Sequence, residues 1–328
     1  MSKIINNKFV LVLMLTALVA GFAMAEGQGE AQGDVTEVIL ADTSWDSILV
    51  HNRIVEFILE EGYGGYEVDF VPGDTIPLFN GVISGDIDAT MESWHTNYPE
   101  AYEEAMADEA IVNLGDNYPD GPQGWWIPRY MLEGDPDRGI EATAPDLTSV
   151  ADLPKYVDLF PDPENPGMGR IIFPPPGWSA TIVSEGILEE FGLEDTYKGF
   201  LPGSGASLAA SMKGAYDQGE PWVGYYWEPT AIMYQLDMVR LEGSEFPRAA
   251  VDILMNAESY EAMPEVVEFF SNYQTTVAVN NEFLNFLNTE AEDHREAAIW
   301  FLENHEEMWT EWVPAEVAEN VRAALQEL

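Results

Sequence analysis

The chain has 328 residues, 46% of them hydrophobic, which is enough for two ordinary domains, or one large one, with a packed core. Its formal net charge of −46 excludes nucleic acid as a natural partner and disfavours an anionic membrane surface, because both require clustered Lys and Arg. The absence of cysteine excludes disulfides, thiolate catalysis, cysteine-based metal sites and lipid attachment through a cysteine.

The first 25 residues predict an export signal. Two lysines form a short basic region, residues 9–20 are almost unbroken apolar sequence, and Ala23-Met24-Ala25 supplies a small-x-small cleavage pattern. A membrane anchor is the alternative, but the apolar stretch is short for a span. We therefore expect a signal peptide at residues 1–25, a flexible leader at residues 26–34, and a soluble periplasmic protein after cleavage.

The residues after the leader predict alternating strands and helices. Strands are expected at residues 37–41, 66–71 and 87–91, and helices at residues 45–59 and 75–83. The side-chain oxygens of residues 42–44 are candidates for capping the first helix. This β-α-β-α-β order implies a mostly parallel sheet with helices on both faces. In such sheets ligands bind beyond the carboxyl ends of the strands.

The remainder of the chain predicts a second α/β region and then a helical end. After residues 127–162, which are rich in Pro, Gly and Asp, strands are expected at residues 170–173 and 222–226 and helices at 179–191 and 208–217. Amphipathic helices are expected at residues 264–273, 282–287, 293–303 and 315–325. This layout predicts lobe one at residues 35–130 and 248–328, interrupted by lobe two at residues 131–247.

Three tryptophans stand where predicted strands end. Trp94 follows the strand at residues 87–91, Trp178 follows a strand and three prolines, and Trp227 closes the strand at residues 222–226. Each ring taken alone is more simply a packing residue. Taken together, three large aromatic rings at three strand ends predict a cage in one cleft.

Such a cage suits a quaternary ammonium group. A trimethylammonium head has no N–H to donate, so ring faces bind it by cation–π attraction, worth about 2 kcal/mol or more each when desolvated. If Trp178 opens a helix, the backbone N–H groups of Ser179 and Ala180 are free to bind a carboxylate at the other end of an osmolyte. The acidity and the five lysines further indicate a saline habitat, which requires osmolyte import.

These motifs resemble those of the substrate-binding proteins of glycine betaine/proline betaine ABC transporters. The likeness runs from about residue 35 to the C-terminus. It is carried by the run that begins at Trp45, Ser-Gly-Asp-Ile-Asp-Ala from Ser84, Pro-Gly-Trp at residues 176–178, and Tyr-Tyr-Trp-Glu-Pro at residues 225–229. The resemblance implies an α/β, two-lobed type II periplasmic-binding-protein fold, in which each lobe is a mostly parallel sheet flanked by helices and two segments cross between the lobes.

The resemblance also implies a site and partners. Three tryptophans box the ammonium in that family, and by motif they fall on Trp94, Trp178 and Trp227, with backbone donors at Ser179 and Ala180. The implied function is an importer's substrate-binding component for glycine betaine or proline betaine, in osmoprotection, without enzymatic activity. Its expected partners are a permease and an ATPase subunit, and the chain is expected to be a monomer.

The chain departs from the family pattern at the carboxylate end of the site. Some members place a histidine four residues after the first box tryptophan; here Tyr98 stands there, and His95 is displaced. Some members have a cysteine after the Pro-Gly-Trp turn, where this chain has Ala180. Tyr98 and His95 are further site candidates, and so is Trp45, for which packing is the simpler interpretation. Packing is also the simpler interpretation of Trp125 and Trp126.

Cofactors and metals are not expected. The four histidines lack metal-ligand spacing, and no phosphate-cradling Gly-Lys-Ser/Thr run or nucleophile elbow is present in the sequence. Three alternatives stay open: a binding protein for choline or carnitine, a receptor domain, and a secreted carbohydrate-active enzyme. The last is considered because sugar subsites also use tryptophan platforms and paired carboxylates.

Overall fold

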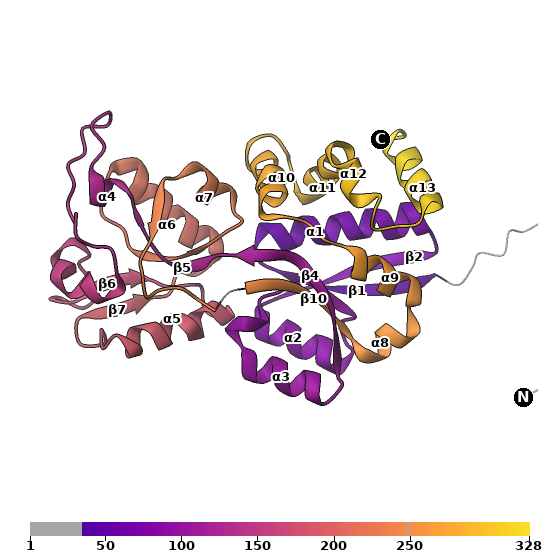
Figure 1. Cartoon of the computed structure of the whole chain (residues 1–328), viewed down its shortest axis with the longest axis horizontal. Coiled ribbons are helices and arrows are strands. Elements are labelled where there is room, and N and C mark those ends of the chain that lie inside the picture. The colour runs from indigo at the N-terminus through magenta and orange to yellow at the C-terminus, as the bar shows by residue number, and fades with distance from the viewer. Residues whose placement is uncertain (1–34, 248) are drawn as a thin grey trace, which may run out of the picture. The chain divides into compact units, whose positions relative to one another are not determined.

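The computed structural model describes residues 35–247 and 249–328 (Figure 1). The predicted signal peptide at residues 1–25 and the predicted leader at residues 26–34 lie outside this range. Within the described residues, no helix has the length and the apolar character that crossing a membrane requires.

The described strands form two five-stranded sheets, ordered β2-β1-β3-β10-β4 and β7-β6-β8-β5-β9. In the first sheet β10 runs antiparallel to its neighbours β3 and β4, whereas β2, β1 and β3 are parallel. In the second, β5 runs antiparallel to β8 and β9, whereas β7, β6 and β8 are parallel. The strands are β1 (Thr36–Thr43), β2 (Tyr66–Gly73), β3 (Ala89–Ser93), β4 (Ile111–Gly121), β5 (Gln123–Pro128), β6 (Gly169–Ile172), β7 (Tyr197–Phe200), β8 (Gly224–Trp227), β9 (Met238–Arg240) and β10 (Ala249–Asn256). The predicted α/β class is confirmed, and each sheet is mixed, with two parallel and two antiparallel pairings.

Helices cover both faces of each sheet (Figure 1). In the first, α1 and the C-terminal helices lie on one side and α2 and α3 on the other; in the second, α5 lies opposite α6 and α7. The helices are α1 (Asp46–Phe57), continued by the π-helix η1 (Ile58–Tyr63), α2 (Thr75–Ser84), the 3₁₀ helix η2 (His95–Asn97), α3 (Pro99–Ala107), α4 (Tyr130–Glu133), the 3₁₀ helix η3 (Val150–Leu159), α5 (Ser179–Glu190), α6 (Gly205–Gln218), α7 (Ala231–Gln235), α8 (Ala257–Ala262), α9 (Pro264–Asn272), α10 (Val277–Thr289), α11 (His294–Asn304), α12 (Glu306–Trp309) and α13 (Ala315–Leu325).

The chain passes between the sheets twice. Strands β4 and β5 belong to different sheets and are separated by Pro122 alone, and after β9 the chain returns to place β10 in the first sheet between β3 and β4. The lobe boundaries predicted at residues 130 and 248 stay a prediction. Strand β5, which those boundaries assign to lobe one, pairs with β8 and β9 of the second sheet.

The capping predicted for α1 is wrong. Strand β1 extends to Thr43, and Trp45, with extended backbone (φ −116°, ψ 148°), occupies the N-cap position without a side-chain capping bond. Asp42 instead accepts hydrogen bonds from Asn52 (2.8 Å) and Arg53 (3.1 Å), both on α1. The N-cap position of α1 therefore carries an indole ring, not a polar cap, just after the carboxyl end of β1.

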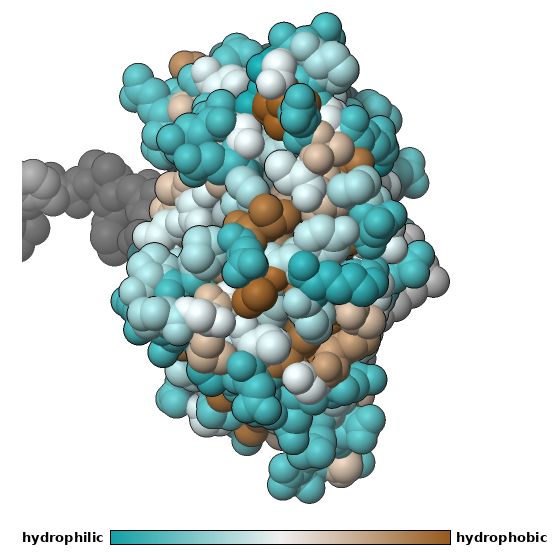
Figure 2. All heavy atoms as spheres, turned by 90° about the vertical axis from the view of Figure 1, so that its left-hand side faces the viewer, coloured by the Kyte–Doolittle hydropathy of each residue, from teal (hydrophilic) through white to brown (hydrophobic). Residues whose placement is uncertain are grey.

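The surface is largely hydrophilic on the face that Figure 2 shows, and the hydrophobic residues there form small separate groups. Buried apolar side chains instead form one cluster that includes residues of both sheets, and a smaller cluster that includes residues of α2 and α3. Where the first cluster connects the two sheets, its members are mostly aromatic.

Candidate functional site

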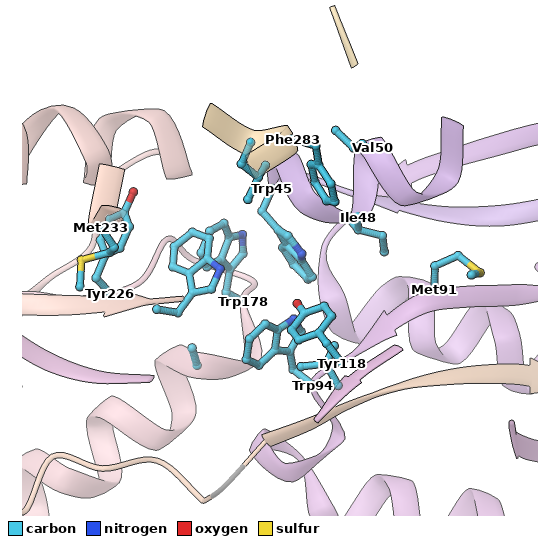
Figure 3. Close-up of a cluster of buried hydrophobic side chains, with 14 of the residues drawn as sticks. Trp45, Ile48, Val50, Met91, Trp94, Tyr118, Trp178, Tyr226, Met233 and Phe283 are labelled. Atoms are coloured by element: carbon cyan, nitrogen blue, oxygen red, sulfur yellow. The ribbon is translucent and has the colours of Figure 1, made fainter. Parts of the chain in front are cut away.

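Four tryptophans line one cavity of about 20 Å³: Trp45, Trp94, Trp178 and Trp227. They come from the N-cap of α1, the end of β3, the N-cap of α5 and the end of β8, and their exposed fractions are 5–8%. Figure 3 shows the side chains of Trp45, Trp94 and Trp178 close together and pointing toward one another. The structure thus brings the three tryptophans of the predicted box together and adds Trp45.

The rings of this cage are held nearly at right angles. The ring centroids of Trp45 and Trp178 lie 5.5 Å apart at an interplanar angle of 73°, and those of Trp178 and Trp227 lie 5.1 Å apart at 80°. Tyr226 stacks on Trp227 with centroids 4.8 Å apart. Perpendicular rings border the cavity from different directions, which suits a compact cation that carries methyl groups on several sides.

Hydrogen bonds from the indoles fix two of these rings. Trp178 Nε1 donates to Ser44 Oγ (3.2 Å), which ties the start of α5 to the loop before α1. Trp45 Nε1 donates to Glu92 Oε2 (2.7 Å), and Ser47 Oγ donates to the same oxygen (3.1 Å). Glu92 is buried in β3, and burial raises the pKa of its carboxyl to about 7 against the lowering effect of these bonds.

The start of α5 supplies the donors expected at the second end of a ligand. Trp178 is the N-cap with extended backbone, and Ser179 and Ala180, the first two helical residues, line the cavity. Backbone N–H groups of a first helical turn have no intrahelical partner, and the helix dipole favours an anion there. Gly177 turns the chain into the helix at φ +91°, where a side chain would also approach Asp74 Oδ2 to 2.5 Å.

The other side chains that line the cavity are uncharged. They were not predicted from the sequence. Asn97 in η2 and Gln123 in β5 join their amides, with the Asn97 Nδ2 group donating to Gln123 Oε1 (3.2 Å). Tyr225 donates its hydroxyl to the same oxygen (2.8 Å), and Thr75 completes the wall. Isolated amides and hydroxyls form no sequence pattern, and the strand that begins at Gln123 was not predicted. An indication was available only for Tyr225, which stands in the Tyr-Tyr-Trp-Glu-Pro motif.

Two of the predicted site residues lie outside the lining of this cavity. His95 Nε2 is 2.9 Å from Asp252 Oδ2, and the ring of His95 stacks on Tyr102 with centroids 4.2 Å apart. The Tyr98 hydroxyl lies 2.7 Å from Ser93 Oγ, and Tyr98 lines a neighbouring cavity of about 10 Å³. The structure therefore places His95 away from the cage cavity, and it places Tyr98 in a neighbouring cavity that Trp45 also lines.

The remaining tryptophan candidates pack elsewhere. Trp125 is fully buried in the second sheet, with its ring centroid 5.9 Å from that of Phe173. Trp126 donates its indole N–H to the backbone oxygen of Tyr226 (3.0 Å). Among residues 35–247 and 249–328, no group of three or more His, Asp and Glu side chains is placed to hold a metal ion.

Comparison with known proteins places this geometry in context. Residues 36–304 match the family described as the substrate binding domain of ABC-type glycine betaine transport systems. A trimethylamine N-oxide-binding protein of Pelagibacter ubique (strain HTCC1062) is 22% identical over 219 residues, 67% of each chain.

Two solved structures are similar over nearly their whole length. The glycine betaine/L-proline-binding protein of an ABC transporter from Borrelia burgdorferi has a TM-score of 0.73 and 20% identity, covering 87% of this chain and 100% of that one. An ABC-transporter choline-binding protein in complex with choline has a TM-score of 0.74 and 18% identity, covering 88% and 98%. These likenesses confirm the predicted two-lobed type II periplasmic-binding-protein fold.

Proposed function

The chain belongs to the family of substrate-binding domains of ABC-type glycine betaine transport systems, and on this premise we propose that it captures glycine betaine or proline betaine for import. The family consists of substrate-binding components and not of enzymes, so the alternative of a carbohydrate-active enzyme is dropped. The observation that carries the proposal is the convergence of four tryptophans and a helix N-terminus on one cavity.

The two halves of this site match the two ends of a betaine. The trimethylammonium or dimethylammonium group would lie against the ring faces, since it offers methyl groups and a diffuse charge but no N–H. The carboxylate would accept hydrogen bonds from the backbone N–H groups of Ser179 and Ala180. A binding site without Lys or Arg is sufficient for such a zwitterion, and all the side chains that line the cavity are uncharged.

Other ammonium compounds have the same cationic end as a betaine but differ at the opposite end. Choline and carnitine would use the same cage with a different far end. Trimethylamine N-oxide is a second candidate, favoured by the relative that carries that name, because its oxygen can also accept hydrogen bonds from the start of α5. The anion-binding character of that helix start favours ligands with a negatively charged end over choline.

We further propose that the protein works outside the cytoplasm as a monomer. Export by the segment at residues 1–25 would place it in the periplasm, where a permease and an ATPase subunit of the importer would receive the ligand. Lobe one would comprise residues 35–130 and 248–328, and lobe two residues 131–247. The net charge of −46 supports use in a saline setting, where osmoprotection is needed.

Titration calorimetry across a panel of ligands tests the function. Glycine betaine, proline betaine, choline, carnitine, trimethylamine N-oxide and glucose would be titrated into the purified chain. We expect the betaines to bind tightest, choline more weakly, and glucose not at all. Tight binding of glucose with no binding of any ammonium compound would overturn the proposal.

A further inference from the structure

A carboxylate lies directly behind the tryptophan cage. Glu92 is 3% exposed and lies in β3; it does not line the cage cavity but the smaller cavity beside it, which Trp45 also lines. Its Oε2 atom accepts hydrogen bonds from Trp45 Nε1 at 2.7 Å and Ser47 Oγ at 3.1 Å. One ring of the cage is therefore held in place by an acidic group that does not itself line the cavity.

Within the part of the chain that the structure describes, this carboxylate has no permanently charged cationic partner. The one basic group recorded near it in the described residues is His51, whose Nε2 atom lies 3.5 Å from Glu92 Oε1. Burial lowers the pKa of His51 to about 3, so its ring is neutral at physiological pH. A buried carboxylate without a positive partner is costly in free energy. Such a group next to a cage for cations suggests that the ligand supplies the missing charge.

Two physical effects connect Glu92 to a cation in the cage. The hydrogen bond from the indole N–H to an ionised oxygen is charge-assisted, which fixes the ring and shifts electron density toward its faces. The negative charge also attracts a cation through an interior of low dielectric constant, where Coulomb interactions are stronger than in water. Neither effect attracts an uncharged group of the same shape into the cage.

We propose that Glu92 is a positioning and specificity-determining residue, whose ionised carboxylate holds Trp45 and makes the cage select a quaternary ammonium group over an uncharged group of the same shape. This inference rests on the proposed function, since it presupposes a quaternary ammonium ligand. Glu92, which does not line the cage cavity, would supply the negative charge that the tryptophans lack.

Among the titratable groups that face one another here, only Glu92 is expected to change its charge near neutral pH. The groups that face it are Trp45, Ser47 and His51 from α1, Trp94 after β3, Tyr118 on β4 and Tyr273 after α9. Burial raises the pKa of both tyrosines well above the ordinary value, so both stay neutral, as His51 does.

The sign of the expected pH dependence follows from linkage. A bound cation favours the ionised form of Glu92, whose pKa is raised to about 7 by burial. Affinity for a permanently charged ammonium ligand should therefore rise as the pH increases through neutrality and level off above it. In the ligand-free protein the raised pKa acts in the opposite direction: the contribution of Glu92 to stability is present below the ordinary carboxyl pKa of 4.5 and is lost as the pH rises through about 7.

The test compares glycine betaine with 3,3-dimethylbutanoate, which has the same shape and carboxylate but a neutral carbon in place of nitrogen. Glu92→Gln keeps the volume and an oxygen that can accept from Trp45, and removes only the charge. At about pH 8 we expect the variant to lose about tenfold in betaine affinity and to change less than about twofold in affinity for 3,3-dimethylbutanoate, whose tert-butyl end is uncharged. Between about pH 6 and pH 8, betaine affinity should rise in the parent and stay flat in Glu92→Gln.

Asp162→Asn is the matched control. Asp162 is also a buried carboxylate, but it pairs with Arg170 and lines none of the cavities that the cage tryptophans border. This variant should keep the parent's pH profile. If Glu92→Gln does not fold, the parent's pH profiles for the two ligands decide the matter alone, because the proposal requires that they differ.

Equal losses for both ligands in Glu92→Gln, or a flat betaine profile in the parent, would overturn the inference and leave a merely structural role for Glu92. Failure of the proposed function has a different signature. In that case the parent would bind no quaternary ammonium compound at any pH.

Discussion

Each cage tryptophan borders the same cavity, so its replacement tests what the rings do. Changing Trp94, Trp178 or Trp227 to Ala should weaken glycine betaine binding by about 2 kcal/mol or more, which is about thirtyfold. Phe keeps a π face with a weaker quadrupole and should lose less, whereas Leu keeps only apolar bulk and should resemble Ala. Titration calorimetry on the nine variants gives this order.

Melting curves of the ligand-free variants separate binding from packing. We expect smaller changes in Tm for the cage variants than for a packing control, because Trp178 packs on Trp45 and Trp227 where the two sheets meet and not within either lobe. Trp300→Ala, on α11 and stacked on Phe286 with centroids 5.2 Å apart, is the control: it should lower Tm and leave affinity unchanged. If two of the three cage Ala variants bind like the parent, the site assignment is wrong.

Cage residues that follow a predicted strand could be predicted from the sequence, whereas the other residues of the cavity lining could not. Trp94, Trp178 and Trp227 each follow a predicted strand, and strand ends meet at one edge of a sheet. Asn97 and Gln123 have no such context, because their hydrogen bond joins the 3₁₀ helix η2 to strand β5, which are distant in sequence. His95 is close to Trp94 in the sequence, but in the structure its ring lies against Tyr102 and Asp252.

At the scale of elements, the start of α5 gives a selective test. Ser179 is the first residue of the helix, and Trp178 before it is extended (φ −77°, ψ 138°), a combination that accepts proline. Ser179→Pro removes one backbone N–H without interrupting the helix. Because a hydrogen bond to a charged group contributes about 1.5–3 kcal/mol, betaine affinity should fall at least tenfold, and choline affinity should change far less.

The matched control is Ser179→Ala, which removes the hydroxyl and keeps the backbone N–H. Calorimetry with both ligands should find this variant close to the parent. Equal losses for betaine and choline in Ser179→Pro would show a general distortion of the site, and a parent-like affinity for betaine would show that this N–H makes no ligand contact.

Helices and strands with a local hydrophobic periodicity were predicted from the sequence. Strands that depend on pairing with residues distant in the chain were not. Helices α1, α2, α5 and α6 and strands β1, β2, β6 and β8 were predicted to within a few residues. Strand β4 contains Gly115 and Pro119, which interrupt any strand pattern, and β10 is stabilised by pairing with two strands more than a hundred residues earlier. No local pattern shows that pairing.

At the scale of the whole molecule, the cage is built from elements of both lobes, and this predicts that the lobes close around the ligand. Trp45 and Trp94 adjoin elements of the first sheet, and Trp178 and Trp227 adjoin elements of the second, so the complete cage exists only when the lobes meet. A ligand that contacts both lobes selects the closed state. Solution X-ray scattering should show a smaller radius of gyration at saturating betaine and no change with glucose. Measurable betaine binding with identical scattering profiles would contradict closure.

The concentration of indoles in one place has an optical consequence. Four of the ten tryptophans in the chain border a single cavity, and the N–H of one of them is bonded to a carboxylate. Indole emission responds to nearby charge and to exclusion of water, so we expect a large part of the ultraviolet fluorescence of this protein to originate in the walls of the proposed binding site. The unlabelled chain should therefore be its own sensor, with an emission spectrum that reports occupancy of the cage and, through Trp45, the protonation of the acid behind it.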